Sequence, residues 1–381
     1  MTVYDDLISI LFKLPDGRNL EEYFKNILLV AKFDETDMVD GAVFPSEGIK
    51  KYSSYQEVLE DFLSTSQVAI EAYAVFNQKS NSQTTSQVMY LMVAKQNTSE
   101  SVTETLDKAK AADGKFVKVV PTSRLPEDIK AVAQWCSIND RFCDFVVTSN
   151  DAVADIVKAN NNHAYAIFRK NANEAIASAV ASTSTCGKFG AKSGSAQFTQ
   201  LNGILPETYT TGEISAMKSN NIAYYTNVSP IEGGETSGFG YNWVMGSRML
   251  GGELRQRQMI MHYIKKSMGL MALEFFNQKP MYDETGNNLL LTLAQKRFKS
   301  FQEYNLVIPT TADQIGYELK VTPIRVGSNS IMNTDAEAYE AKKYKLTGYY
   351  YDAIVGEKVD FTFTIDPTEE EVAEIIGGDG E

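Results

Sequence analysis

The fold class is decided by the run Val88-Met89-Tyr90-Leu91-Met92-Val93-Ala94, which opens a regular alternation of strand and helix patterns. A continuous apolar run of this length predicts a buried strand, and Ser101–Ala112 after it reads as a helix. The alternation continues with predicted strands at 116–120, 142–148 and 163–168 and predicted helices at 125–137, 149–160 and 171–182. Strands that alternate with helices of this length are typical of βαβ units, so we expect a mostly parallel sheet with right-handed crossovers.

Toward the N-terminus the same pattern begins with the apolar run Asn26–Ala31, a further predicted buried strand. Ser54 is expected to cap a helix that runs to about Leu63, with Glu57 completing a capping box. The remaining segments are read as a loop at 34–51, a helix at 66–76 and an exposed polar loop at 77–87.

A long amphipathic helix is predicted from about Leu250 to Phe276. Apolar residues recur at steps of three, four and seven, which is the period of one helix face. These are Leu250, Leu254, Met261, Ile264, Met268, Met271 and Phe275. The opposite face is expected to carry Glu253, Arg255, Arg257, Lys265 and Lys266. Met259, Met261, Met268 and Met271 are interpreted as adaptable core residues.

The segments that follow this helix change in character. Asn287–Phe301 is predicted to be a second helix, and Asp283 before it suits a turn or the start of that helix. Two segments alternate with period two, as half-buried strands do: Gln314–Val321 and Lys358–Ile365. The last residues, Thr368–Glu381, are acidic and are expected to fray.

Charge and composition exclude several classes of function. The 381 residues carry a net charge of −13, which argues against a nucleic-acid-binding protein because such proteins need a basic surface. The longest apolar run, around Met268–Phe276, is interrupted by Glu274 and is too short to span a bilayer, so we expect no membrane insertion. Asp5 and Asp6 stand where a signal peptide would be basic, which favours synthesis in the cytoplasm.

The sequence offers little catalytic or ligand-binding chemistry. Gly187–Ser193 resembles a phosphate loop, but its glycines are misplaced and it follows a helix, so it is interpreted as an ordinary loop. The two histidines, His163 and His262, lie beside no nucleophile motif and are interpreted as structural. Cys136, Cys143 and Cys186 lack metal-ligand spacing and are expected to be reduced structural thiols. Acidic pairs such as Asp283-Glu284 are expected by chance in so acidic a chain. We therefore predict no catalytic, cofactor-binding or metal-binding residues.

A set of phrases in fixed order carries a family resemblance. The order is Leu201-Asn202-Gly203-Ile204-Leu205-Pro206, then Asn220-Asn221-Ile222-Ala223-Tyr224-Tyr225, then the turn Gly233-Gly234-Glu235-Thr236-Ser237-Gly238, then the long helix, then Pro280-Met281-Tyr282-Asp283-Glu284-Thr285-Gly286. This order resembles the sheath-like proteins of contractile bacteriophage tails, in a compact form without large inserted domains. The likeness covers residues 181–308 best and extends to residues 26–170, whereas the first 25 and last 70 residues match only in general character.

The resemblance implies an α/β fold with a C-terminal α+β part and extended terminal arms. The expected division is an N-terminal arm at 1–25, the first part of the core at 26–185, a helical and Gly-rich second part at 186–308, and a C-terminal β part and arm at 309–381. The implied function is that of a non-enzymatic virion protein, a sheath subunit that contracts around the tail tube. Its partners would be further copies of itself, the tube protein, the baseplate and the tail terminator.

Two other functions remain open at this stage. The βαβ pattern suits a nucleotide- or metabolite-binding enzyme, because ligands often bind at the switch point of a parallel sheet. Another tail component, such as a tube or baseplate protein, would share the structural character. For a sheath, Lys358–Ile365 is expected to add a strand to a neighbouring subunit, with Leu7–Leu14 as the other candidate arm.

Overall fold

The computed structural model describes residues 20–78, 88–148, 161–171, 174–183, 195–229, 240–281, 283–312, 315–321 and 346–352. Several predicted features lie outside these residues and stay predictions. They are the helix at 149–160, the loop at 187–193, Cys186, both proposed arm strands and the acidic C-terminal segment. The four-part division of the chain also stays a prediction.

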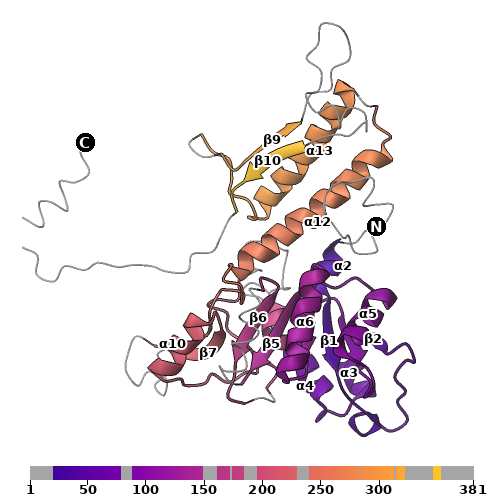
Figure 1. The fold of residues 1–381 in the computed structure, drawn as a ribbon, viewed down its shortest axis with the longest axis vertical. Helices are drawn as coiled ribbons and strands as arrows, with labels where there is room; N and C mark the ends of the chain where they lie inside the picture. Colours follow the sequence, from indigo (N-terminus) through magenta and orange to yellow (C-terminus); the bar gives the residue numbers. More distant parts are fainter. Residues whose placement is uncertain are drawn as a thin grey trace, which may run out of the picture.

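One sheet organises the first two thirds of the chain (Figure 1). Within the described residues it has eight strands in the order β2-β3-β1-β4-β5-β6-β7-β8. The strands are β1 (Ile27–Ala31), β2 (Ile49–Tyr52), β3 (Leu91–Lys95), β4 (Lys118–Pro121), β5 (Phe142–Val147), β6 (Ala164–Phe168), β7 (Ala223–Val228) and β8 (Tyr241–Met245). The six central strands are parallel, and the edge strands β2 and β8 run antiparallel to their neighbours. The predicted α/β fold with a mostly parallel sheet is confirmed.

Helices cover both faces of this sheet. Helices α3 (Tyr55–Asp61), α4 (Gln67–Phe76) and α8 (Ile176–Thr183) contribute to the core on one face, together with Ile27, Leu29 and Ala31 of β1. Helices α5 (Val102–Ala112), α6 (Pro126–Ile138) and α10 (Thr211–Ser219) contribute to the other, with Leu28 and Val30. Burial on both faces is the reason that the central strands are mainly apolar, although β4 and β5 contain the buried Lys118 and Asp144. We call this part of the structure, described residues 20–254, the α/β body.

The ends of the helices follow their capping residues. Ser54, Ser66 and Ser101 each accept a backbone hydrogen bond at the start of α3, α4 and α5. The capping box predicted for Ser54 and Glu57 is only half formed, because the Glu57 carboxylate accepts instead from the amide of Ser53, at 2.6 Å.

Two strands at the edges were not predicted. Residues 34–51 were expected to be a loop, but the segment holds the short 3-10 helix η1 (Glu35–Asp37) and most of β2. At the opposite edge β8 turns back along β7, and Gly246 follows it with a φ of 116°. A Cβ atom on Gly246 would lie 2.9 Å from the Cα of Ala223, so this close approach requires glycine.

The last third forms a separate packing unit, which we call the helical lobe (described residues 255–352). Helix α12 (Arg255–Asn277) extends away from the body, and α13 (Glu284–Glu303) returns along it (Figure 1). The antiparallel ribbon of β9 (Tyr317–Val321) and β10 (Leu346–Tyr350) packs on α13. Asp283 caps α13 by accepting from the amide of Gly286 at 3.0 Å. The two predicted helices and the strand within 314–321 are therefore present, whereas β10 was not predicted.

Candidate functional site

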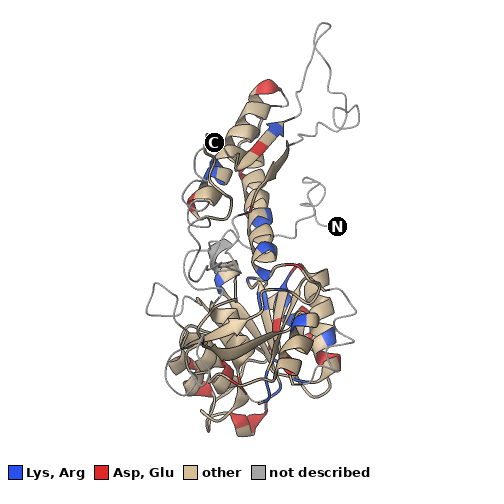
Figure 2. Ribbon diagram, turned by 90° about the vertical axis from the view of Figure 1, so that its left-hand side faces the viewer, with Lys and Arg blue, Asp and Glu red and all other residues tan. Residues whose placement is uncertain are grey.

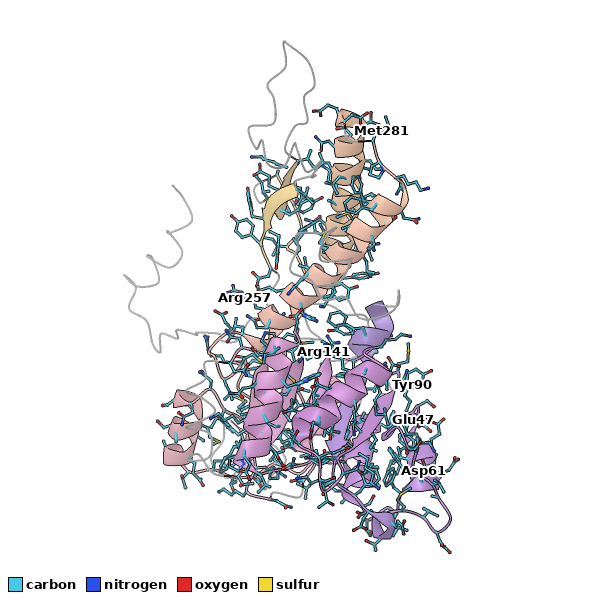
Figure 3. All side chains as sticks on the ribbon, turned by 45° about the vertical axis from the view of Figure 1, so that its right-hand side comes forward. Glu47, Asp61, Tyr90, Arg141, Arg257 and Met281 are labelled. Carbon is cyan, nitrogen blue, oxygen red and sulfur yellow. The ribbon has the colours of Figure 1, made fainter. Side chains whose placement is uncertain are left out.

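Helix α12 has two covered sides, and one of them is polar. Arg255, His262 and Lys266 are spaced by seven and four residues, so they share a helix face. All three are buried, and they face Asp144 of β5 and Asp140 in the turn before β5 rather than water. Figure 3 shows this junction near Arg141 and Arg257, with Met281 at the far end of the lobe. We call it the α12 junction.

The first contact of the junction is a buried ion pair. One guanidinium nitrogen of Arg255 lies 3.1 and 2.9 Å from the two carboxylate oxygens of Asp144. The guanidinium carbon also lies 4.9 Å from the centre of the Tyr165 ring, which adds a cation–π contact. Removing one partner of such a buried pair typically costs about 3–5 kcal/mol, because the other charge is left uncompensated.

The second contact is centred on Asp140, in the turn between α6 and β5. Its backbone has a φ of 57°, a left-handed conformation that Asp and Asn tolerate better than most residues. Its carboxylate accepts from Lys265 at 3.1 Å and Lys266 at 3.0 Å and lies 3.3 Å from Nδ1 of His262. Burial alone would raise the pKa of Asp140, but the hydrogen bond from His262 and the two lysine charges hold it well below its ordinary value.

His262 connects this carboxylate to two residues of the body. The Tyr23 hydroxyl lies 3.0 Å from Nε2 of His262, and Arg141 donates to the Tyr23 oxygen at 2.7 Å. Burial lowers the pKa of His262 to about 4, although Asp140 opposes the shift, so the ring is neutral at pH 7. We infer that Nδ1 carries the proton toward Asp140 and that Nε2 accepts from Tyr23.

The order carboxylate, imidazole, phenol resembles a catalytic proton relay, but its burial argues for a structural role. Tyr23 is 0% exposed and His262 is 4% exposed, so a substrate cannot reach either side chain. His163 also has structural partners, since its Nδ1 lies 2.7 Å from the Arg141 carbonyl oxygen and its ring stacks on Phe142. Both histidines therefore have partners within the described residues, and their structural role stays a prediction.

The predicted solvent face of α12 is wrong for two residues. Arg255 and Lys266 are buried in the junction, whereas Arg257 and Lys265 are partly exposed and pair with Asp352 and Asp140. Met261, predicted for the apolar face, is 45% exposed. The prediction from the helical period assumed that only one side of α12 is covered by protein. In the structure, α13 covers one side of α12 and the body covers another. Met259 and Met271 are buried core residues as expected.

The switch point of the sheet lies between the carboxyl ends of β1 and β4, because the helices that follow these strands cover opposite faces. Its described residues are mainly acidic or already paired. Asp128, in the first turn of α6, accepts from Ser123 at 2.7 Å and pairs with Lys32 at 3.4 Å. Glu127 precedes it, so carboxylates occupy the helix start at which a phosphate would bind. This arrangement disfavours a nucleotide at this position.

The remaining candidates show no reactive arrangement in the described part of the chain. Cys136 and Cys143 are free and buried, and burial raises the pKa of the Cys143 thiol well above its ordinary value. No group of three or more His, Cys, Asp or Glu side chains there is placed to hold a metal ion. None of the described helices is both long and apolar enough to cross a membrane. The absence of a cofactor stays a prediction.

Charge is distributed unevenly over the described residues (Figure 2). The α/β body carries more Asp and Glu than Lys and Arg, and the helical lobe carries more Lys and Arg. The loop after β1 contributes exposed acids at the end of the body farthest from the lobe. The basic residues of α12 named above lie instead at the junction and are already paired within the chain.

Comparisons with known proteins identify the fold. No family model matches the chain, and no curated protein matches it in sequence. In structure it is similar to a chain of the cryo-EM structure of the anti-feeding prophage (AFP) baseplate, 6-fold symmetrised. The TM-score is 0.59 at 11% identity, over 91% of this chain and 94% of that chain. The likeness covers the body and the lobe together, and at this identity it shows a shared fold.

Proposed function

We propose that this chain is a structural, non-enzymatic subunit of a contractile tail, and specifically its sheath. The observation that carries the proposal is the nearly full-length fold similarity to a chain of a 6-fold symmetrised prophage baseplate. The ordered phrases between residues 201 and 286, which resemble sheath-like proteins, agree with it independently. The expected partners are further copies of the chain, a tail tube, a baseplate and a tail terminator, in a virion tail.

The mechanism would be mechanical. A sheath assembles in an extended packing and changes to a denser one, so the energy lies in the difference between two packings of the same subunit. The rigid α/β body, with both sheet faces covered, suits such a subunit. The β9–β10 ribbon suits a tether, because a two-stranded ribbon is marginal alone and a further strand can extend it. The apolar alternation of Lys358–Ile365 makes it the expected donor from a neighbouring copy.

A baseplate component is the second candidate, favoured by the kind of assembly in which the similar chain was found. Negative-stain microscopy of the purified chain separates the two. A sheath subunit is expected to form long hollow cylinders without other proteins. Discrete particles that assemble only with further tail proteins would favour the baseplate.

The enzyme alternative has its own test. Purified protein is expected to show no thermal shift with ATP, GTP, NAD or divalent metal ions, since the described switch point is acidic. A saturable shift of several degrees with one nucleotide would overturn the structural proposal.

The tether is tested by truncation before Gly356. If Lys358–Ile365 is donated, the truncated chain should stay folded and soluble, lose polymerisation and keep its melting temperature. Misfolding would mean that the segment belongs to its own subunit, and unchanged cylinders would mean that it is dispensable.

A further inference from the structure

The two edges of the eight-stranded sheet differ in charge. At one edge, Lys50 and Lys51 of β2 pair with Asp61 and Asp113. Charged side chains on an edge strand, lysine above all, keep it from pairing with a strand of another chain. At the other edge, β8 contains no charged residue. Strand β8 therefore lacks the electrostatic protection that β2 has.

The uncharged character extends into the segments that contact β8. The segment at 198–199 hydrogen-bonds to the backbone of Val244, and β7 pairs along the inner side of the strand. We call β8 and the segment 198–199 the β8 edge. Residues 195–206, 223–229 and 240–247 contain no Asp, Glu, Lys or Arg, although these four types make up 22% of the chain. The β8 edge is thus set in an uncharged part of an otherwise acidic body.

Three aromatic rings form a cluster on the β8 edge. The rings of Tyr241 and Trp243 stack with their centres 5.0 Å apart and their planes 4° from parallel. The Phe198 ring meets that of Trp243 edge-on, with the centres 5.2 Å apart. Tyr241 is 63% exposed and Phe198 is 36% exposed, so the cluster lies open to solvent. Interface centres are rich in Trp and Tyr and poor in charged residues, which is the composition of this cluster.

The backbone of β8 also has hydrogen-bonding groups left for a partner. The amide of Val244 donates to Thr199 and its carbonyl accepts from Phe198, both at 2.9 Å, on the side away from β7. Residues two apart in a strand direct their backbone groups to the same side, so those of Asn242 also point away from β7. In the part of the chain that the structure describes, no backbone hydrogen bond reaches them on that side. A neighbour that buries the rings can therefore also pair with Asn242.

From these features we propose that the β8 edge, with its aromatic cluster at the centre, is a docking surface for a second copy of this chain. Copies with a net charge of −13 repel one another, and the repulsion is least where the contact surface carries no charge. A basic partner would instead be attracted to the acidic end of the body. The identity of the occupant rests on the proposed function, whereas the choice of face rests on the contacts above.

Trp243 reports directly on the proposed surface. The chain has two tryptophans, and Trp135 is 4% exposed, so Trp135→Phe leaves Trp243 as the fluorescent probe. Acrylamide quenching is measured over a dilution series of the full chain, and sedimentation velocity follows association in the same samples. As copies associate, quenching is expected to decrease and emission to shift to shorter wavelength. If Trp135→Phe does not fold, the parent serves in its place, because a buried tryptophan is quenched little.

Tyr241→Lys gives β8 the type of side chain that protects β2. This variant should weaken association by about tenfold or more, because tyrosines at interface centres contribute strongly to binding. The matched control is Val43→Lys, which adds the same charge at an 82% exposed apolar position in the loop before β2. The control should associate as the parent does.

The outcomes separate this docking surface from the function on which it rests. Association that leaves Trp243 as open to the quencher as before, or that is equal in Tyr241→Lys and the parent, would overturn the docking surface and leave the proposed function standing. A chain that stays monomeric at every concentration would overturn the sheath proposal as well.

Discussion

The α/β body and the helical lobe bury their apolar side chains in different ways. The body places one sheet between two helix layers, so each central strand is buried on both faces. The lobe has two helices and a two-stranded ribbon, which share only small apolar clusters, and of these elements α12 is also covered by the body. The stability of the body therefore depends on tertiary packing shared by many elements, whereas the lobe depends on a few contacts and helix ends. We expect the lobe to open locally at a lower free energy than the body.

The largest expected effect comes from the centre of the sheet. Phe145 in β5 is fully buried, so Phe145→Ala should lower the free energy of unfolding by about 4 kcal/mol through lost burial and a cavity. Urea denaturation measures this. Ile138→Ala on α6, at a 74% exposed position, is the control and should change little. Equal losses in both variants would contradict the described core.

A smaller and more local effect is expected in the lobe. Phe275→Ala removes a buried ring between α12 and α13. It should lower the free energy of local unfolding of these two helices by about 3 kcal/mol. Hydrogen exchange should speed up in α12 and α13 and stay unchanged in β1, β4 and β5. Phe276→Ala, at the neighbouring partly exposed position, is the control. Faster exchange throughout the body would show that the two units do not open separately.

The junction makes stability depend on pH in a predictable direction. Burial lowers the pKa of Lys266 from its ordinary 10.5 to about 8, partly opposed by Asp140. Between these values the unfolded chain binds the proton and the folded chain does not, so stability rises with pH. Between pH 7.5 and 9.5, titration of Lys266 should raise the free energy of unfolding of the parent by about 2 kcal/mol. In Lys266→Met this contribution should be absent. The control Lys130→Met, at an exposed position, should show the same pH dependence of the free energy of unfolding as the parent. Identical pH dependence in the parent and Lys266→Met would refute the assignment to Lys266.

The smallest effect concerns a single helix cap. Asp283→Ala removes the acceptor for the Gly286 amide and should destabilise α13 by about 1 kcal/mol. Asp283→Asn keeps a side-chain oxygen that can accept this hydrogen bond, so it should lower the stability of α13 by only a few tenths of a kcal/mol. Exchange of the first-turn amides of α13 is the appropriate measurement, and equal exchange in the two variants would rule out a capping role.

The fold was largely predictable because the central strands carry their own signal. Burial on both faces makes β1 a continuous apolar run and leaves β3 and β5 with one charged residue each, Lys95 and Asp144, and serine caps mark helices that follow β1 and β3. The edge strand β2 carried no such signal. Its Lys50 and Lys51 form ion pairs with Asp61 and Asp113, contacts that arise only after folding. The ribbon strand β10 is short and includes Gly348, so it has no apolar run or clear alternation to mark it.

The α12 junction could not be read from the sequence for a related reason. Lys266 and Asp140 are 126 positions apart, and neither position has an unusual local pattern. A helical period identifies an apolar face, and the remaining face is assigned to solvent by default. That default failed for Arg255 and Lys266 because a second surface, itself polar, covers them. A clue was available in His262, which stood in the middle of a helix without any motif around it.

The close approach of Gly246 to β7 has a consequence for recognising relatives. At 11% identity, apolar side chains can be exchanged for one another throughout the core, so they retain little that a search can detect. A backbone contact cannot be exchanged in this way, because any Cβ at position 246 would meet Ala223. Distant relatives should therefore keep glycine directly after the edge strand and a small residue at the start of its neighbour, even where nearly every other position has diverged.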